Sequence, residues 1–297
     1  MTLAGSAINM GLVAFKFVSG ILGGSAAMIA DAVHSLSDLL TDAIVLVFVH
    51  ISEKPQDEDH DYGHGKYETM ASSIIGIALL LVGAAICYDG VLRIASVING
   101  ETLPQPGLIA FVAALVSIVL KEWAYRFTVR VGRRVGSPAV VANAWHHRSD
   151  ALSSIGTAVG IGGAIVLGSH WTVLDPIAAV VVSLLIMQQA LKQIRQSSDE
   201  LLEKSLPEET ERKISEIVMQ EPGVSDIHHL CTRRIGSSIA VEMHLRMDAQ
   251  MTLADSHTHA TAIEQRLRNE FGSRTHIILH VEPTKPGMKP GECSLER

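Results

Sequence analysis

The sequence predicts an α-helical polytopic membrane protein with six transmembrane helices, followed by a small α+β domain. Two observations predict this fold class. About two hundred N-terminal residues fall into long apolar runs, whereas the residues after Ser205 alternate between short helix-like and strand-like segments. Long helices without a polar face are expected in a soluble protein only deep inside a much larger structure. We therefore expect the N-terminal part of this 297-residue chain to lie in a lipid bilayer.

Six apolar runs are long enough to cross the hydrocarbon core of a bilayer as helices. Breaks rich in charge, glycine or proline separate them, such as residues 53–68 and 99–107. The first run carries Lys16 and leads directly into the second, which indicates a retained span and not a cleaved signal peptide. The expected spans are residues 2–22, 27–51, 70–96, 106–129, 139–167 and 174–199.

Basic residues near the span ends predict the orientation in the membrane. They lie between spans two and three, between spans four and five, and after span six, whereas the opposite loops carry no Lys or Arg. Such residues prefer the cytoplasmic side of a membrane. We therefore expect both chain termini in the cytoplasm.

The chain is expected to divide near Ser205. Residues 1–204 form the transmembrane domain, residues 205–283 a cytoplasmic domain, and residues 284–297, where Pro and Gly recur, a flexible tail. The cytoplasmic domain has an α-β-β-α-β order, which predicts helices on one face of a three-stranded sheet. Its expected elements are a helix at 207–220, strands at 225–233 and 238–247, a helix at 253–271 and a strand at 276–282.

Composition excludes several classes of function. The net charge of −7, without a run of Lys and Arg, argues against nucleic-acid binding. Cys87, Cys231 and Cys293 are too few and too scattered for a disulfide framework or a Cys-x-x-Cys zinc site. No His-Glu-x-x-His motif supports a membrane metalloenzyme.

Two pairs of ionisable residues lie inside expected spans. His34 and Asp38 are four residues apart in span two, and His146 and Asp150 are four apart in span five, so each pair shares one helix face. A charged side chain at the bilayer centre costs at least about 2.5 kcal/mol, so these residues indicate function. Two imidazoles and two carboxylates complete a tetrahedral zinc site. Helix–helix hydrogen bonds or a proton relay without metal remain the alternative.

Other ionisable residues near these pairs fit the site less well. Asp31 and Asp42 extend the stripe of span two but are more typical of helix-end or packing residues. His147 lies roughly a hundred degrees around the helix from His146 and is left out of the site.

Two further clusters lie outside the expected membrane spans. Asp57, His60 and His64 fall within eight positions of a loop, which is equally consistent with a metal site and with a solvated acidic loop. The soluble domain carries too many ionisable groups for a small core unless they meet, and strand alternation puts two of them, His280 and Glu282, on one face. The full set is His228, His244, His257, His280 and Glu282, with His229, Cys231, His259 and His276 as less suitable ligands.

These motifs resemble those of the cation diffusion facilitators. The matching segments are Gly23 to Asp38, Tyr62 to Glu68, His146 to Ala151 and Asp175-Pro176, and the resemblance covers nearly the whole chain. It implies a homodimer of six-span protomers in a lipid bilayer, in the cytoplasmic (inner) membrane of a bacterium. It also implies a secondary transporter and not an enzyme, one that exports metal ions from the cytoplasm in exchange for protons.

The resemblance also assigns metals and roles. The His-Asp, His-Asp quartet resembles the zinc-preferring branch, and imidazole ligands suit zinc better than oxygen-only sites do. Asp57, His60 and His64 match a second, surface zinc site. The histidines of the ferredoxin- or metallochaperone-like cytoplasmic domain, with Glu282, match a regulatory binuclear site, and Lys66 and Glu203 match a charge interlock. Transport of Fe²⁺, Mn²⁺, Co²⁺ or Cd²⁺ and a non-transporting membrane metal sensor or scaffold remain the alternatives.

Overall fold

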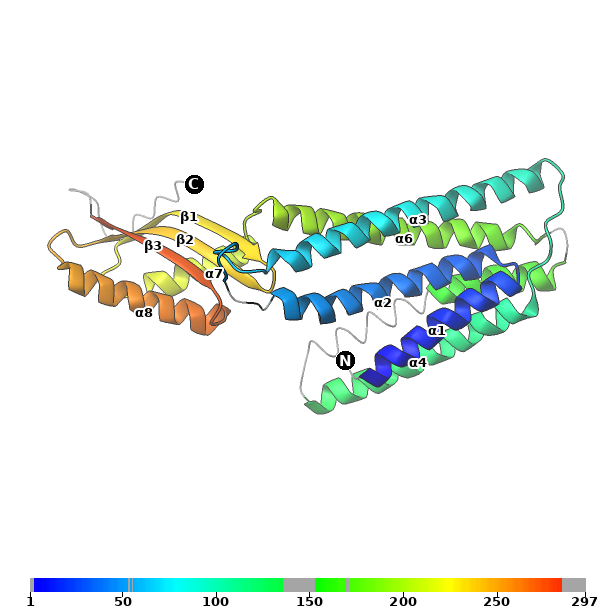
Figure 1. Cartoon of the computed structure of the whole chain (residues 1–297), viewed down its shortest axis with the longest axis horizontal. Helices are drawn as coiled ribbons and strands as arrows, with labels where there is room; N and C mark the ends of the chain where they lie inside the picture. The colour runs from blue at the N-terminus through cyan, green and yellow to red at the C-terminus, as the bar shows by residue number, and fades with distance from the viewer. Residues whose placement is uncertain (1–2, 53, 55, 136–152, 169–170, 285–297) are drawn as a thin grey trace. The chain divides into compact units, whose positions relative to one another are not determined.

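Long helices correspond to the apolar runs of the N-terminal part (Figure 1). A computed structural model describes residues 3–52, 54, 56–135, 153–168 and 171–284 of the chain. The helices are α1 (Leu3–Leu22), α2 (Ala26–Ser52), α3 (Lys66–Ile98), α4 (Leu108–Val135), the helical segment Ser153–Val166 and α6 (Leu174–Leu201).

Three of the described helices are long and apolar enough to cross a membrane: α3, the part of α4 up to Arg130, and α6. Large apolar side chains cover their outer surfaces; Leu81 of α3 and Val119 of α4, for example, are both 66% exposed. Lipid accommodates such a surface and water does not. Six spans stay a prediction, because the expected span at 139–167 is described only from Ser153 onward.

The helices α3 and α4 extend beyond the apolar runs that predicted them. The α3 helix begins at Lys66 and not at residue 70, and α4 ends at Val135 and not at residue 129. Polar residues continue both helices; Arg126, for example, pairs with Glu122 one turn earlier at 2.7 Å. Hydropathy marks the apolar part of a helix, whereas backbone hydrogen bonds decide where it ends.

Small residues bring the helices of the membrane part close together. Its core contains nine buried alanines, among them Ala110, Ala113 and Ala114 of α4. Where α1 ends, the Gly107 amide donates to the Gly23 carbonyl at 2.8 Å, and a side chain on Gly23 would lie 2.9 Å from the Ala110 Cβ. Close backbone approach through small residues is the usual way in which membrane helices associate.

A buried carboxylate ties α6 to the start of α2. Asp175 is 4% exposed and accepts hydrogen bonds from the Ser25 hydroxyl at 2.6 Å and from the Ala26 amide at 2.8 Å. The first amides of a helix have no partner within the helix, so a carboxylate from a neighbouring helix satisfies them and complements the helix dipole. This contact fixes where α2 begins.

The C-terminal domain has the predicted α-β-β-α-β order. Its elements are α7 (Glu208–Met219), β1 (Asp226–Ile235), β2 (Ser238–Met247), α8 (Leu253–Phe271) and β3 (His276–Pro283). The sheet order is β1-β2-β3, with β1 antiparallel and β3 parallel to β2.

Alternation along β2 separates the core from the polar face of the sheet. Every second residue, including Val241, Met243 and Leu245, is buried in one apolar cluster with residues of α7 and α8 such as Ile214 and Ile263. The intervening positions of β2 therefore point to the opposite face.

The loop between α2 and α3 packs with the C-terminal domain. Residues 46–73 and 195–297 form one compact unit, and residues 1–45 and 74–194 form the other. A side chain on Gly65 would lie 2.9 Å from the Ile235 carbonyl oxygen, and the Arg233 guanidinium lies 5.6 Å from the centre of the Tyr62 ring. The predicted boundary near Ser205 stays a prediction, since this unit also includes the end of α6.

Two glycines of the segment Ser153–Val166 test the close helix packing. A side chain on Gly160 would lie 2.4 Å from the Ala178 Cβ of α6, whereas a side chain on Gly156 would meet nothing within 4 Å among the described residues. We expect Gly160→Ala to destabilise the protein by about 1–3 kcal/mol through overpacking. Gly156→Ala is the matched control, with no loss expected. Thermal unfolding of the full-length protein in detergent measures both, and equal midpoints for the two variants would contradict the packing.

Candidate metal sites

The stripe predicted on α2 faces the interior of the membrane part. His34 is only 9% exposed, and Ser37, one turn further on, donates to the His34 carbonyl at 2.7 Å. Asp38 is partly buried on the same stripe. The other two predicted ligands, His146 and Asp150, lie outside the described residues, as do His147 and the side chain of Asp42.

Asp31 begins the same stripe but is paired with a lysine. Its carboxylate lies 2.6 Å from the Lys16 ammonium of α1, and neither side chain is exposed. Ser154, in the segment Ser153–Val166, donates to both carboxylate oxygens at 3.0 and 3.1 Å. Both oxygens of the Asp31 carboxylate therefore have partners in Lys16 and Ser154, in agreement with the predicted role of Asp31 in packing. The stripe alone did not reveal Lys16; the only sequence signal was a lysine inside an apolar run.

The loop residues Asp57, His60 and His64 come together. One ligand atom from each side chain lies within 4.8 Å of the others. The Asp57 carboxylate lies 3.1 Å from His60 Nδ1 and 3.2 Å from His64 Nε2. Two imidazoles and a carboxylate leave one position of a tetrahedron open, which suits an ion that is taken up and released.

Local hydrogen bonds organise this loop. The backbone amides of Asp59 and His60 donate to the Asp57 carboxylate at 3.1 and 2.9 Å, and Tyr67 places its hydroxyl 3.2 Å from His60 Nε2. Desolvation acts to raise the pKa of Asp57, but the hydrogen bonds from His60 and Asp59 and the charge of His64 together lower it. The carboxylate is therefore ionised at neutral pH and able to bind a cation.

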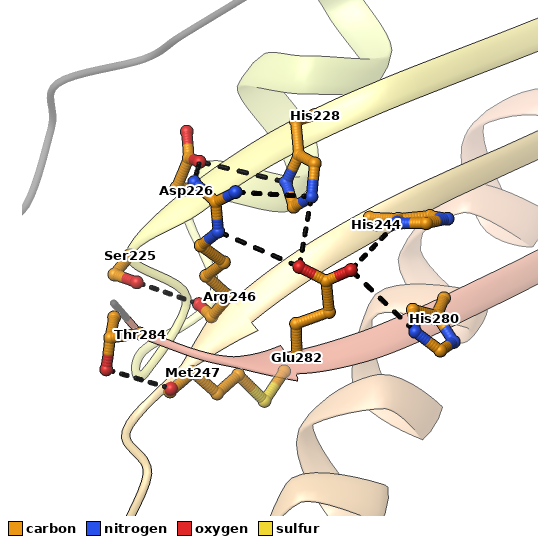
Figure 2. Close-up of polar contacts among 9 residues, drawn as sticks. All are labelled: Ser225, Asp226, His228, His244, Arg246, Met247, His280, Glu282 and Thr284. Atoms are coloured by element: carbon orange, nitrogen blue, oxygen red, sulfur yellow. Dashed lines mark hydrogen bonds and ion pairs between the residues drawn. The ribbon is translucent and has the colours of Figure 1, made fainter. Parts of the chain in front are cut away.

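Strand register builds a third cluster on the polar face of the sheet (Figure 2). His228 of β1 is directly opposite His244 of β2, which is directly opposite His280 of β3. The next row holds Asp226, Arg246 and Glu282. Because opposite residues share a face, three histidines and one glutamate converge there.

Glu282 is the centre of this cluster. Its two oxygens lie 3.1 Å from His228 Nε2 and 3.1 Å from His244 Nδ1, and His280 Nε2 lies 3.8 Å away (Figure 2). Ligand atoms of His228, His244 and Glu282 fall within 4.8 Å of one another. These three residues could hold a metal ion, whereas His280, 62% exposed on its side chain, lies at the rim.

Burial and the charges around the cluster favour the deprotonated forms of His228 and Glu282. Burial and the charge of Arg246 lower the pKa of His228. Desolvation acts to raise the pKa of Glu282, but the hydrogen bond with His244 and the nearby His228 and Arg246 charges lower it overall. A neutral imidazole and an ionised carboxylate are the forms that bind metal. Arg246 is itself held by Asp226 at 2.7 Å, a pair that sequence reasoning missed because the partners lie on different strands.

A β-bulge changes the direction of the His229 side chain, one of the less suitable ligands. The register of β1 shifts between His228 and Cys231, and His229 adopts a left-handed φ of 49°. The His229 ring consequently lies 5.1 Å from the His244 ring. Bulges commonly redirect a side chain beside a functional site.

The remaining predicted ligands of this domain lie elsewhere. His257 is exposed on α8, and its role as a ligand stays a prediction. His259 pairs with the buried Glu221 at 2.6 Å, and His276 packs against Tyr62 with a ring distance of 5.3 Å. Cys231 is exposed on β1. The first two contacts favour the structural roles expected for His259 and His276.

Lys66 and Glu203 form an ion pair, which Arg233 extends. The Lys66 ammonium contacts one Glu203 oxygen, and the Arg233 guanidinium lies 3.0 Å from the other. Glu203 adopts a left-handed φ of 61°, a conformation that costs energy for a residue with a side chain. The contact agrees with the predicted pairing, and its role as an interlock stays a prediction.

Comparison with known proteins matches two family models. Residues 2–202 match the cation efflux transmembrane domain, and residues 206–284 match the cytoplasmic domain of cation efflux proteins.

Curated relatives cover most of the chain. Metal tolerance protein C1 of Arabidopsis thaliana is 35% identical over 94% of this chain, which spans 61% of that relative's length. The manganese efflux system protein MneP of Bacillus subtilis is 33% identical over 93% of this chain and 92% of its own. The magnetosome protein MamB of Paramagnetospirillum magneticum is 34% identical over 91% and 88%. A solved zinc form of CzrB is 24% identical over 29% of this chain and 98% of its own, with a TM-score of 0.26.

If the cluster around Glu282 binds zinc, removal of one of its histidines should weaken zinc binding. In a background that carries Asp38→Ala and Asp57→Ala to remove the other sites, His244→Ala removes an imidazole 3.1 Å from Glu282. We expect zinc affinity of the full-length protein to fall at least about tenfold. His259→Ala, which removes a histidine paired with Glu221, is the matched control. Isothermal titration with Zn²⁺ measures both, and an equal loss in the two variants would contradict this assignment.

Proposed function

The chain belongs to the cation efflux family of divalent-metal transporters, and we propose that its cargo is zinc, carried out of the cytoplasm in exchange for protons. The protein is an integral membrane protein and a transporter, not an enzyme. The family also includes manganese efflux proteins, so the zinc preference depends on the ligands of this chain.

The observation that carries the proposal is the contact between Asp31 and Ser154. It sets α2 beside the segment Ser153–Val166 at one level of the membrane part. The other end of that segment lies near the start of α4, because Gln105 donates to the Ala164 carbonyl at 3.1 Å. Gly107, just before α4, in turn donates to the carbonyl of Gly23, in the turn between α1 and α2. The segment and α2 therefore run antiparallel.

The antiparallel arrangement of α2 and the segment Ser153–Val166 supports a site with four ligands. On α2, His34 and Asp38 follow Asp31 by about one and two helical turns. In the sequence, Asp150 and His146 precede Ser154 by about one and two turns of a helix. In antiparallel helices these positions lie at matching levels. We propose that His34, Asp38, Asp150 and His146 hold the transported ion between the two helices.

The chemistry of these ligands favours zinc. The filled d shell of zinc imposes no coordination geometry, and zinc in proteins is usually bound by four ligands in a tetrahedron. Two imidazoles and two carboxylates supply such a set. Manganese prefers oxygen-rich, six-coordinate surroundings. Manganese is the second candidate because a relative of similar length is a manganese efflux protein, and Fe²⁺, Co²⁺ and Cd²⁺ remain alternatives in the same fold.

Protons are the proposed counter-ion. Metal binding requires deprotonated ligands and releases protons from them. Histidine has an ordinary pKa near neutrality, so a modest change in proton concentration shifts the competition between proton and metal. Exposure of the site to the side opposite the cytoplasm then lets protons replace the ion. Alternating access of this kind requires only rocking of the helices around the site.

The two cytoplasmic sites are proposed to supply and sense the cargo. The loop site of Asp57, His60 and His64 has the open position of a loading site. The cluster around Glu282 is proposed to bind regulatory zinc and to draw the two cytoplasmic domains of a homodimer together, since a cation offsets the repulsion between like-charged faces. Lys66 and Glu203 are proposed to lock the dimer. We also propose that both termini and this domain lie in the cytoplasm and that the protein lies in the inner membrane of a bacterium.

Zinc transport depends on the α2 carboxylate in this proposal. In proteoliposomes with zinc, manganese, iron and cadmium in competition, we expect Asp38→Ala and Asp150→Ala to lower zinc uptake at least about tenfold. The matched control is Asp89→Ala, which removes a carboxylate that is 57% exposed and paired with Arg93 on α3. Zinc uptake that survives both site variants would contradict the proposed site. A non-transporting scaffold would move no metal even in the wild type.

A further inference from the structure

One lysine is completely buried inside the membrane part. Lys16 lies on α1, a helix whose other residues carry no charge, and its exposed fraction is 0%. A lysine near the end of a membrane helix usually extends its ammonium to the interface. Lys16 instead directs its ammonium inward, toward the stripe that carries the predicted metal ligands.

The ammonium has three described partners. It lies 2.6 Å from Asp31 and donates to Ser35 at 2.9 Å and to Ser154 at 3.4 Å. Ser154 also donates to Asp31 and lies 3.5 Å from Ser117 of α4. The network therefore joins α1, α2, α4 and the segment Ser153–Val166 around a single ion pair.

A buried ion pair of this kind needs an explanation beyond stability. The desolvation of two charges offsets much of their attraction, and apolar residues of similar volume are often as stable or more stable. In a membrane the cost of each charge is larger still, so intramembrane ionisable residues indicate function. The position of this pair suggests what that function is.

The pair adjoins the proposed transport site. Asp31 lies three residues before His34, and Ser35, which accepts from Lys16, immediately follows His34. Asp38 lies on the same stripe of α2, about two helical turns beyond Asp31. Lys16 therefore pairs with the carboxylate of this stripe that is closest in sequence to His34, a proposed metal ligand.

We propose that Lys16 determines metal specificity by withholding Asp31 from the transported ion. The inference rests on the proposed function, because it concerns the same site. With Asp31 bound to an ammonium and a hydroxyl, the ion meets two imidazoles and two carboxylates, a set that suits zinc. If Asp31 were released, a third carboxylate would become available. More oxygen ligands and a higher coordination number favour manganese. Lys16 is thus a positioning residue that acts through Asp31.

Three variants separate this role from a structural one. Lys16→Met releases the Asp31 carboxylate and is expected to shift preference toward manganese. Asp31→Asn leaves the Lys16 ammonium without its carboxylate, and this cation then repels the divalent ion, so transport of every metal should fall. Lys16→Met combined with Asp31→Asn removes both charges and adds no ligand, so zinc preference should return. A purely structural pair predicts instead that either single variant damages transport of both metals equally and that the double variant is no better.

The experiment is competition between Zn²⁺ and Mn²⁺ in proteoliposomes, with uptake normalised to the amount of monodisperse protein reconstituted. For Lys16→Met we expect the Mn²⁺ to Zn²⁺ uptake ratio to rise by about 10-fold to 100-fold, the scale on which outer-shell changes alter metal sites. The double variant should return the ratio to within about threefold of wild type, a difference smaller than that of one outer-shell change. Lys16→Gln, which keeps a hydrogen-bond donor without the charge, serves if Lys16→Met does not fold.

The outcomes distinguish this inference from the proposed function. An unchanged ratio in Lys16→Met or Lys16→Gln, with zinc uptake that still requires Asp38, would overturn the role of Lys16 and leave zinc transport intact. A raised ratio that the double variant fails to restore would also overturn it. Wild-type protein that moves no metal in an Asp38-dependent way would instead overturn the proposed function.

Discussion

The membrane part depends on the rule that a charge removed from water must be paired. Lys16 and Asp31 satisfy it at 2.6 Å, and the same contact holds α1, α2 and the segment Ser153–Val166 together. Asp175 satisfies it in another way, by accepting the first amides of α2. Two buried carboxylates thus fix where α2 begins and how it faces its neighbours. These contacts fix the position of the α2 stripe that carries the proposed metal ligands. The ionisable residues of a transport site must also have their charges neutralised inside the membrane, and the cargo or protons do this. The two buried carboxylates hold the helices in place around such a site.

The cytoplasmic domain uses strand register for the same purpose. Direct opposition of His228, His244 and His280 brings ligands from three strands into one row, and the next row supplies Glu282 and its neighbour Arg246. The apolar half of the alternation faces α7 and α8, so an apolar core and a cluster of candidate metal ligands occupy opposite faces of one small sheet. A shift of β3 by one residue would move His280 and Glu282 into the core. Folding of the sheet therefore also assembles the cluster.

Local patterns in the sequence predicted which residues of one element lie together. Helical spacing put His34 and Asp38 on one stripe of α2, loop spacing brought together Asp57, His60 and His64, and alternation placed β2 at Ser238–Met247. The role of these residues as metal ligands stays a prediction. Partners on different elements were harder to predict. Nothing near Lys16 in the sequence indicates its partner Asp31, which lies fifteen residues later on the next helix. Likewise, nothing near Arg246 indicates its partner Asp226. The start of α3 at Lys66 was missed because polar residues continue a helix beyond its apolar run. These gaps reflect tertiary contacts, which override local propensity.

The central claim is that the transported ion sits in a shell of two imidazoles and two carboxylates on α2 and the fifth span. X-ray absorption at the zinc edge tests it most directly, on full-length protein that carries Asp57→Ala and His244→Ala to remove the other sites. The account predicts a four-coordinate shell of nitrogen and oxygen at about 2.0–2.1 Å, with the outer-shell scattering of two imidazoles, and its loss in Asp38→Ala. A six-coordinate shell of oxygen alone, or a shell that Asp38→Ala leaves unchanged, would contradict it.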